Sequence, residues 1–285
     1  MAALQHGGTY RRALGVSIER IWENALDWEH LPYLHASTFT SIELLERTTA
    51  PELWRARVGI RGVIASQVVI ELRTDRPRLA YVTTTIEGLG RGTEIRTRLQ
   101  PRGEHQTDIV VEFHVASGSR LVARVAAAGY QRLYHRLWSE DEAMMRHRQR
   151  VLDVAAARRA ERDRLAARRA PEPVALGPLP QVRERLPLKV ATPRGELRVI
   201  ALGSSLLAHP TTCPHLGGPL GDVPVIHGSI TCPWHGYRFD VRTGRAAGPH
   251  RCKLPVPPQV EVDPSTQLVR LVWAAPDDVE LEPVA

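Results

Sequence analysis

Cysteine is scarce in this sequence, with three residues among 285, at positions 213, 232 and 252. Three thiols cannot build a disulfide framework, so we expect a protein of the reducing cytoplasm. The sequence also lacks any run of about 18 apolar residues, the length of a transmembrane helix, so we expect no membrane partner. Residues 1–8 show no basic stretch followed by an apolar one, so a secretory signal is not expected either.

Acidic residues are few in one segment, residues 146–170, which holds nine arginines against three carboxylates. This segment accounts for six of the seven net positive charges, and the rest of the chain is close to neutral. A nucleic-acid-binding protein usually spreads its cations over a folded face, so we expect no nucleic-acid partner. A solvated helix is the simplest interpretation, and a docking surface for an acidic redox partner is the alternative.

The pattern of residues 8–150 indicates one domain. A strand is expected over 8–16, a helix over 18–26 that begins after Ser17, and several strands between 38 and 116, where Val, Ile and Thr recur with period two. Ser119 opens a long amphipathic helix. This order of elements resembles the helix-grip (START-type) fold, in which a curved sheet and a helix enclose a ligand cavity, and it predicts an α+β domain.

The second half of the chain differs in composition. Five prolines lie between residues 171 and 187, and we interpret the basic helix and this proline-rich stretch, residues 151–187, as a stiff linker. Short strands and frequent turns return over residues 188–285, which predicts a second, all-β domain.

Two short segments of that domain combine cysteine with histidine: Cys213-x-His215 and, after sixteen residues, Cys232-x-x-His235. Two thiolates and two imidazoles can hold either a zinc ion or a [2Fe–2S] cluster of Rieske type. Proline and glycine flank both pairs, and residues 236–240 read Gly-Tyr-Arg-Phe-Asp; both features resemble Rieske domains. The resemblance implies a [2Fe–2S] cluster with the two cysteines on one iron and the two histidines on the other. Zinc remains the alternative.

A second group of metal-ligand residues lies in the first domain. Asn24, Asp27, His30 and His35 follow the spacing Asn-x-x-Asp-x-x-His-x4-His. Asp27 and His30 share a helix face, and Pro32 interrupts the helix so that His35 can turn back toward His30. This segment resembles the one that binds mononuclear iron in Rieske non-heme iron oxygenases, whose catalytic domain has the helix-grip fold.

The resemblance implies a third ligand, a carboxylate on the long C-terminal helix of the catalytic domain. Residues 138–142 read Trp-Ser-Glu-Asp-Glu, and we assign Asp141 as this ligand, with Glu140 and Glu142 left open as alternatives. His30, His35 and Asp141 would form a facial triad for Fe(II). In the family, the residue matched by Asp27 bridges a cluster-binding histidine and an iron-binding histidine by hydrogen bonds. The order of the two domains is the reverse of that in most family members.

These resemblances predict the terminal oxygenase of a Rieske non-heme iron system, which uses O2 to oxidise a small organic substrate by hydroxylation, dealkylation, desaturation or cyclisation. Electrons would come from NAD(P)H through a separate ferredoxin or flavin reductase, because the chain has no Gly-rich nucleotide fingerprint. The alternative is a non-catalytic fusion of a helix-grip ligand carrier with a Rieske ferredoxin. In that case His30 and His35 would be ordinary residues.

The resemblance also bears on assembly. As a helix, residues 146–170 would extend about 37 Å, at about 1.5 Å per residue. The proline-rich stretch could add up to about 50 Å. Such a chain can hold its cluster far from its own iron, and family members commonly solve this in a head-to-tail trimer. We therefore expect a homotrimer in which the cluster of one subunit serves the iron of its neighbour.

Overall fold

The computed structural model describes residues 3–62, 66–165, 172–248 and 252–273. It divides into two compact units, Met1–Arg150 and Val151–Ala285. Each unit has its own hydrophobic core. Among the described residues, no helix combines the length and the apolarity needed to span a bilayer.

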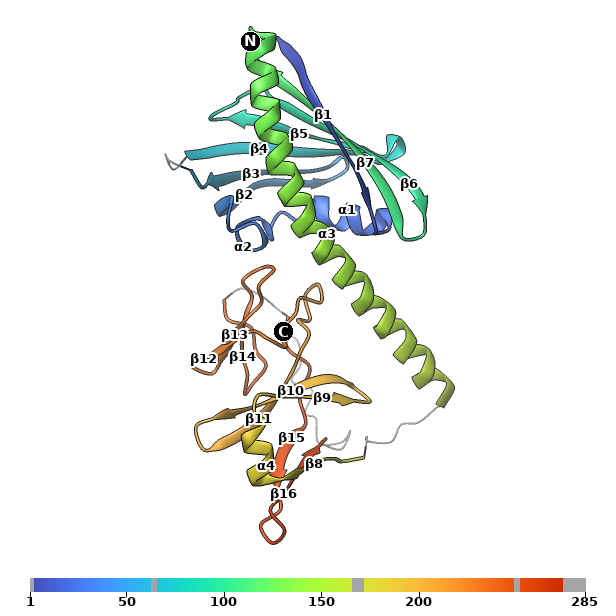
Figure 1. The fold of residues 1–285 in the computed structure, drawn as a ribbon, viewed down its shortest axis with the longest axis vertical. Helices are drawn as coiled ribbons and strands as arrows, with labels where there is room; N and C mark the ends of the chain where they lie inside the picture. The colour runs from blue at the N-terminus through green and yellow to red at the C-terminus, as the bar shows by residue number, and fades with distance from the viewer. Residues whose placement is uncertain (1–2, 63–65, 166–171, 249–251, 274–285) are drawn as a thin grey trace. The chain divides into compact units, whose positions relative to one another are not determined.

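The first unit is built on one antiparallel sheet of seven strands in the order β1-β7-β6-β5-β4-β3-β2. Figure 1 shows that this sheet is strongly twisted and that α3 runs across one of its faces. Strands β2 to β7 are neighbours in the order in which they follow one another along the chain, and β1 lies at the edge beside β7. Two helices, α1 and α2, connect β1 to β2 at the opposite edge. The elements are β1 (Leu4–Leu14), α1 (Ile18–Leu26), α2 (Leu31–Leu34), β2 (Phe39–Thr49), β3 (Glu52–Ile60), β4 (Ser66–Asp75), the 3-10 turn η1 (Arg76–Arg78), β5 (Ala80–Glu87), β6 (Glu94–Gly103), β7 (Gln106–Ala116) and α3 (Arg120–Leu165).

Alternation along the strands explains why α3 packs on this face. In β7 the side chains of Ile109, Val111 and Phe113 are buried, because every second residue of a strand points to the same side. Phe113 stacks on Tyr130 of α3, with ring centroids 5.7 Å apart, and meets Tyr134 edge-on at 5.2 Å. The unit therefore has the helix-grip architecture that the sequence predicted.

The observed elements match the sequence predictions closely in this unit. Helix α1 has the predicted bounds, with Ser17 at its N-cap, while β1 begins four residues earlier than predicted. Helix α3 has 46 described residues and continues past Arg150 into the second unit. The predicted continuation of this helix to Arg169 falls partly on residues 166–171, which lie outside the described residues.

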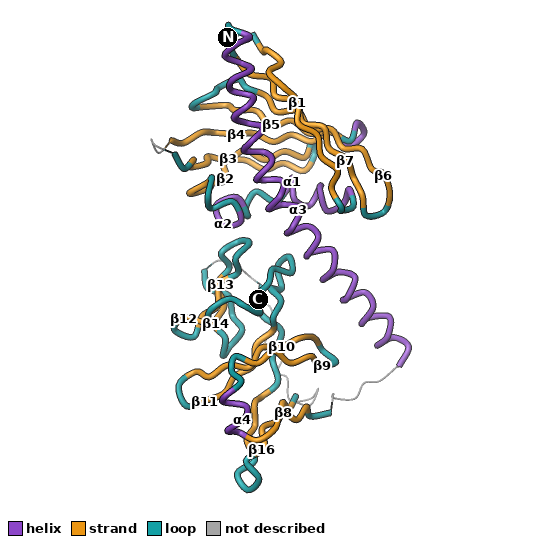
Figure 2. The backbone as a smooth tube through the Cα atoms, in the orientation of Figure 1, coloured by secondary structure: helices purple, strands orange, loops and turns teal. Residues whose placement is uncertain are grey.

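The second unit contains short strands joined by long loops, as the colouring in Figure 2 shows. Three sheets of three strands each have the orders β11-β10-β9, β12-β13-β14 and β15-β16-β8. The unit is therefore the all-β domain that the sequence predicted, with one short helix. Its elements are β8 (Val174–Pro178), α4 (Leu179–Glu184), β9 (Leu188–Thr192), β10 (Gly195–Leu202), β11 (Ser205–Pro210), β12 (Val225–Ile226), β13 (Ser229–Thr231), β14 (Arg238–Asp240), β15 (Gln259–Val262) and β16 (Leu268–Val272).

The structure differs from the sequence prediction over residues 174–184, which we expected to belong to the linker. Strand β8 pairs with β16, and Val182 of α4 is fully buried against Leu206 and Val269. The prolines mark the ends of elements: Pro178 precedes α4 and Pro180 lies in its first turn, where a missing N–H costs no helical hydrogen bond. This stretch is therefore folded into the second unit.

Candidate metal centres

The two cysteine–histidine segments of the second unit form loops with the same backbone hydrogen bonds. The N–H of Cys213 donates to the carbonyl of Gly218, and the N–H of Gly217 donates back to the carbonyl of Cys213. In the other loop, Cys232 donates to Tyr237, and Gly236 donates to Cys232. Each cysteine therefore begins a closed turn whose fifth residue is glycine, so the two turns have the same backbone structure although the histidine is the third residue of one and the fourth residue of the other.

Glycine is required at the fifth position of both loops. Gly217 has a φ of 82° and Gly236 a φ of 68°, values in the left-handed region that other residues adopt only at a cost. The same closed geometry brings both cysteines inward, and their side chains are buried. The Pro and Gly residues around the ligands in the sequence thus encode the shape of the two turns.

The four candidate ligands lie together at the ends of these loops. The imidazole rings of His215 and His235 have centroids 4.5 Å apart, and the ring of Tyr237 stacks on His215 at 4.5 Å. Hydrogen bonding with Cys213 lowers the pKa of Cys232, against the opposing effect of burial, and further hydrogen bonds to His235 and to backbone N–H groups lower it too. The pKa of Cys213 is raised by its hydrogen bond to Cys232 and by burial.

This arrangement fits a cluster with two sulfur and two nitrogen ligands. A side chain at Gly218 would place its Cβ 2.6 Å from the sulfur of Cys232 and 3.3 Å from Trp234. The loop therefore leaves space beside that sulfur that only glycine preserves. Sequence analysis did not assign a role to Tyr237, although it belongs to the Gly-Tyr-Arg-Phe-Asp segment; its ring covers one face of a candidate ligand.

The second group of candidate ligands lies in the first unit, where His30, His35 and Asp141 each place one ligand atom within 4.8 Å of the others. All three side chains are buried. The Oδ1 atom of Asp141 lies 3.0 Å from Nε2 of His35 and 3.6 Å from Nε2 of His30. The structure thus brings together three residues that the sequence places in two distant segments.

The single-turn helix α2 positions the two histidines. His30 is the residue before its first turn and His35 the residue after its last, and Pro32 lies within that first turn. The proline therefore begins this new helix. As a result the two rings meet edge to face, with centroids 5.2 Å apart. Contrary to the sequence prediction, Pro32 does not interrupt α1, because α1 already ends at Leu26, and Asp27 and His30 lie between the two helices rather than on one helix face.

The structure distinguishes the three consecutive carboxylates of α3. Asp141 faces both histidines. Glu142 faces β1, where its two oxygens accept hydrogen bonds from Arg12 and from the backbone N–H of Gly15. Glu140 lies on the far side of His35, with Oε2 at 2.6 Å from Nδ1. The geometry therefore supports Asp141 as the candidate ligand rather than either neighbour.

Asp27 occupies the C-cap of α1, and its Oδ2 lies 3.5 Å from Nδ1 of His30. This nitrogen is the one that does not face Asp141. Asp27 is thus beside the candidate iron site, on the ring that the sequence analysis paired with it. A carboxylate in this place can fix the tautomer and the orientation of the imidazole.

The donor set fits a divalent transition metal. Two imidazoles and one carboxylate are the ligands of a facial Fe(II) site. Two ligand atoms that each lie about 2.1 Å from one ion at a right angle are about 3.0 Å apart, close to the observed separations of 3.0 and 3.6 Å. Asp141 Oδ1 is also buried without a well-aligned hydrogen bond from any described residue, as expected of an atom that faces an ion.

The protonation state of His35 depends on the two carboxylates beside it, those of Asp141 and Glu140. Burial acts to lower the pKa of His35, but the interactions with Asp141 and Glu140 outweigh it, and the pKa is raised. Without a metal ion, the buried cluster therefore favours a proton on His35. A divalent cation would replace that proton as the partner of Asp141.

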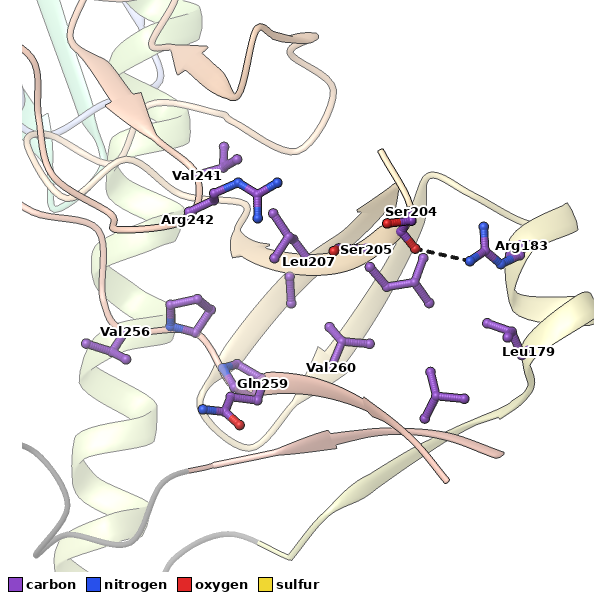
Figure 3. A pocket seen from close by; sticks show the side chains of 15 residues that line it. Leu179, Arg183, Ser204, Ser205, Leu207, Val241, Arg242, Val256, Gln259 and Val260 are labelled. Atoms are coloured by element: carbon purple, nitrogen blue, oxygen red, sulfur yellow. Dashed lines mark hydrogen bonds between the residues drawn. The ribbon is translucent and has the colours of Figure 1, made fainter. Parts of the chain in front are cut away.

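The second unit also contains an open groove with a volume of about 680 Å³ (Figure 3). Leu207 and Val260 contribute apolar side chains, and Arg183 on the rim donates a hydrogen bond to the carbonyl of Ser204. None of the eight candidate site residues lines this groove. It is therefore separate from both candidate metal centres.

Comparison with known proteins agrees with the description of the second unit. Residues 172–258 match the model of the Rieske [2Fe–2S] domain. This stretch is a Rieske domain, and it gives the chain an electron-transfer module with a [2Fe–2S] cluster. No curated protein sequence matches the chain.

Several solved structures are similar to parts of the chain. An aromatase/cyclase from Streptomyces sp. R1128 is 13% identical, with a TM-score of 0.44, and the match covers 51% of this chain and 95% of that one. A protein from Thermus thermophilus is 22% identical, with a TM-score of 0.40 and coverages of 47% and 93%. The ferredoxin of carbazole 1,9a-dioxygenase from Nocardioides aromaticivorans IC177 is 28% identical, with a TM-score of 0.30 and coverages of 35% and 98%.

Proposed function

We propose that the chain is the terminal oxygenase of a Rieske non-heme iron system. The observation that carries this proposal is the convergence of His30, His35 and Asp141 in a chain that also contains a Rieske domain. A helix-grip domain that only carried a ligand would have no need to bury two histidines against a carboxylate, because such groups cost free energy unless they are paired or bind a metal.

In this proposal each group of ligands holds its own metal. The loops at Cys213, His215, Cys232 and His235 would hold the [2Fe–2S] cluster. The site of His30, His35 and Asp141 would hold a mononuclear Fe(II), which, when bound, leaves coordination positions open for O2 beside a small organic substrate.

The protein residues around the second site orient the ligands and exclude water. Oδ2 of Asp27 lies 3.5 Å from Nδ1 of His30, and Nε2 of the same ring is directed at Asp141. The ring of Phe39 meets His35 edge-on, with centroids 6.2 Å apart, and the side chain of His35 is only 1% exposed. Electrons for the reaction would come from NAD(P)H through a separate ferredoxin or flavin reductase and pass toward His30 by way of Asp27.

Assembly is part of the same proposal. We expect a homotrimer in which the cluster of one subunit serves the iron of its neighbour, since ring-closing, head-to-tail interfaces allow such an arrangement. Co-expression of Cys213→Ser and His30→Ala chains, each inactive alone, tests this directly. Turnover in the mixed oligomer supports transfer between chains, whereas a mixed oligomer that forms and stays inactive contradicts it.

Metal and sulfide analysis of anaerobically purified protein tests the proposed function. About three irons for two sulfides per chain are expected for the oxygenase, because a [2Fe–2S] cluster alone accounts for two of each. Two irons for two sulfides, even after incubation with Fe(II), would favour the non-catalytic fusion of a ligand carrier with a ferredoxin. A colourless protein that contains zinc would contradict both.

A further inference from the structure

The two imidazoles of the candidate iron site each have a second carboxylate behind them. For His35, Nε2 faces Asp141 at 3.0 Å, while Nδ1 lies 2.6 Å from Oε2 of Glu140. For His30, Nε2 faces the same oxygen of Asp141 at 3.6 Å, while Nδ1 lies 3.5 Å from Asp27. Each ring therefore lies between a carboxylate at the centre of the site and another at its edge.

We propose that Glu140 is a positioning residue for the iron site, which accepts a hydrogen bond from Nδ1–H of His35 and so fixes Nε2 as the metal-binding nitrogen. This inference rests on the proposed function, because it requires an ion at His30, His35 and Asp141. It extends that function to a residue that the sequence suggested only as an alternative ligand.

The physical argument begins with the tautomers of histidine. A neutral imidazole carries one N–H and one lone pair, and either nitrogen can hold the proton. A carboxylate next to Nδ1 retains the proton there, frees the lone pair of Nε2 and makes that nitrogen a stronger ligand. The contact of 2.6 Å between Glu140 and His35 is as short as charge-assisted hydrogen bonds are.

Because the ring of His35 is buried, its Nδ1 depends on Glu140 as a hydrogen-bond acceptor. The side chain of His35 is 1% exposed, whereas that of Glu140 is 31% exposed. Water therefore cannot readily replace Glu140 as the acceptor at Nδ1, while the carboxylate itself keeps contact with solvent. Such an arrangement supplies a charged acceptor to a buried ring without burying a second full charge.

The helix explains how two consecutive residues serve one histidine. Side chains at adjacent positions of a helix point about 100° apart and do not face each other. The imidazole of His35 spans this gap, because Asp141 lies at one of its nitrogens and Glu140 at the other. The pair Glu140–Asp141 therefore fixes both the place and the orientation of the ring.

Metal affinity tests the role of Glu140. The full chain with its cluster would be depleted of the mononuclear metal and titrated anaerobically with Mn(II), whose free ion is counted by its EPR signal. We expect wild-type protein to bind one Mn(II) per chain and Glu140→Ala to bind it about 10- to 100-fold more weakly. Glu140→Gln keeps an acceptor oxygen and should lie between them. Glu104→Ala, which removes a carboxylate that is 89% exposed, is the control and should bind as wild type.

A second measurement reports on the N–H group itself. With Co(II) in the site and Zn(II)-loaded protein as the reference, ligand imidazole N–H protons give solvent-exchangeable, hyperfine-shifted NMR signals. Wild-type protein should show two such signals from this site. One of them should broaden or disappear in Glu140→Ala, because the proton of His35 is no longer held by a carboxylate. A residue that only supported the fold would leave both signals in place.

The outcomes separate this inference from the proposed function. Wild-type protein that binds no Mn(II) would contradict the iron site itself. Wild-type protein that binds Mn(II), together with a Glu140→Ala variant that binds equally well and retains both N–H signals, would leave the iron site standing and refute the role of Glu140. If Glu140→Ala does not fold, as judged by circular dichroism, the nearly isosteric Glu140→Gln variant decides by the same two measurements.

Discussion

Arg12 donates a hydrogen bond from Nη2 to Oε2 of Glu142 at 2.7 Å, and this contact joins β1 to α3 one residue beyond the candidate ligand Asp141. The other oxygen of Glu142 accepts from the backbone N–H of Gly15 at 3.0 Å. Since α3 cannot rotate on the sheet without breaking both contacts, Glu142 fixes the helix face that carries Asp141. Glu142, which the sequence left open as a ligand, is thus directed at β1 and not at the two histidines of the candidate site.

Replacing Arg12 with alanine should therefore destabilise the first unit. The lost charge-assisted hydrogen bond to a largely buried carboxylate is worth about 1–2 kcal/mol, after allowance for the partial exposure of Arg12. Urea unfolding monitored by circular dichroism measures the change. Arg78→Ala, which removes an exposed ion pair with Asp75, serves as the control and should leave the unfolding midpoint unchanged. Equal effects of the two variants would contradict the structural role of Arg12.

The two loop glycines should be essential for cluster assembly. Gly217→Ala and Gly236→Ala force alanine into the left-handed region, at a cost of about 1–2 kcal/mol per residue. We expect less visible cluster absorption per chain in both variants. Gly129→Ala, a helical position with open space around the added Cβ, should keep full absorption. Full clusters in both loop variants would mean that the turns can close without glycine.

Cys213→Ser should abolish the visible absorption of the cluster and leave the first unit folded. The two units have separate cores, and a domain with its own core can fold without its neighbour. Absorption spectroscopy tests the first expectation, and Mn(II) binding at the site of His30 and His35 tests the second. Unchanged absorption in the variant would show that Cys213 is not a cluster ligand.

His30→Ala and Asp27→Asn should affect the proposed oxygenase differently. His30→Ala removes a proposed metal ligand, so turnover should be lost while dithionite still reduces the cluster. Asp27→Asn keeps the shape of the side chain but removes its charge. Both metals should therefore remain, and the rate of turnover should fall about 10- to 100-fold. Oxygen uptake and iron analysis distinguish the two. Wild-type turnover in His30→Ala would refute the oxygenase proposal.

Acid should destabilise the second unit through His209. Burial lowers the pKa of this fully buried histidine, and the charge of Arg198 adds to the effect, while the hydrogen bond to Pro210 opposes it. Below about pH 6.5 the unfolded chain therefore binds a proton that the folded unit does not, and stability falls as the pH falls. This contribution is fully present above that pH.

The measurement is the unfolding of the second unit, followed by cluster absorption as a function of pH. His209→Gln cannot take up the proton, so its stability should change less steeply with pH below about 6.5. An identical pH dependence in the variant and in the wild type would show that His209 does not contribute.

The sequence by itself determined the local structure. Period-two alternation predicted strands that the first unit contains, and the bounds of α1 follow from a helix-capping residue and a helical pattern. Proline and glycine beside the cysteines marked the resemblance to Rieske domains, and glycine at the fifth position of each loop suits the backbone angles there, which only a residue without a Cβ readily adopts. These features depend on residues a few positions apart, and the sequence displays such neighbours directly.

Only the tertiary structure decided which carboxylate faces which partner. Glu140, Asp141 and Glu142 are consecutive and chemically alike, and their directions depend on how α3 rotates on the sheet. That rotation is set by contacts between distant segments, such as the one from Glu140 to His35 across 105 positions. Similarly, the sequence predicted a linker where β8 lies, because its pairing partner β16 is far along the chain. The local sequence pattern determines whether a segment forms a helix or a strand. Tertiary packing determines which of its side chains face the candidate site.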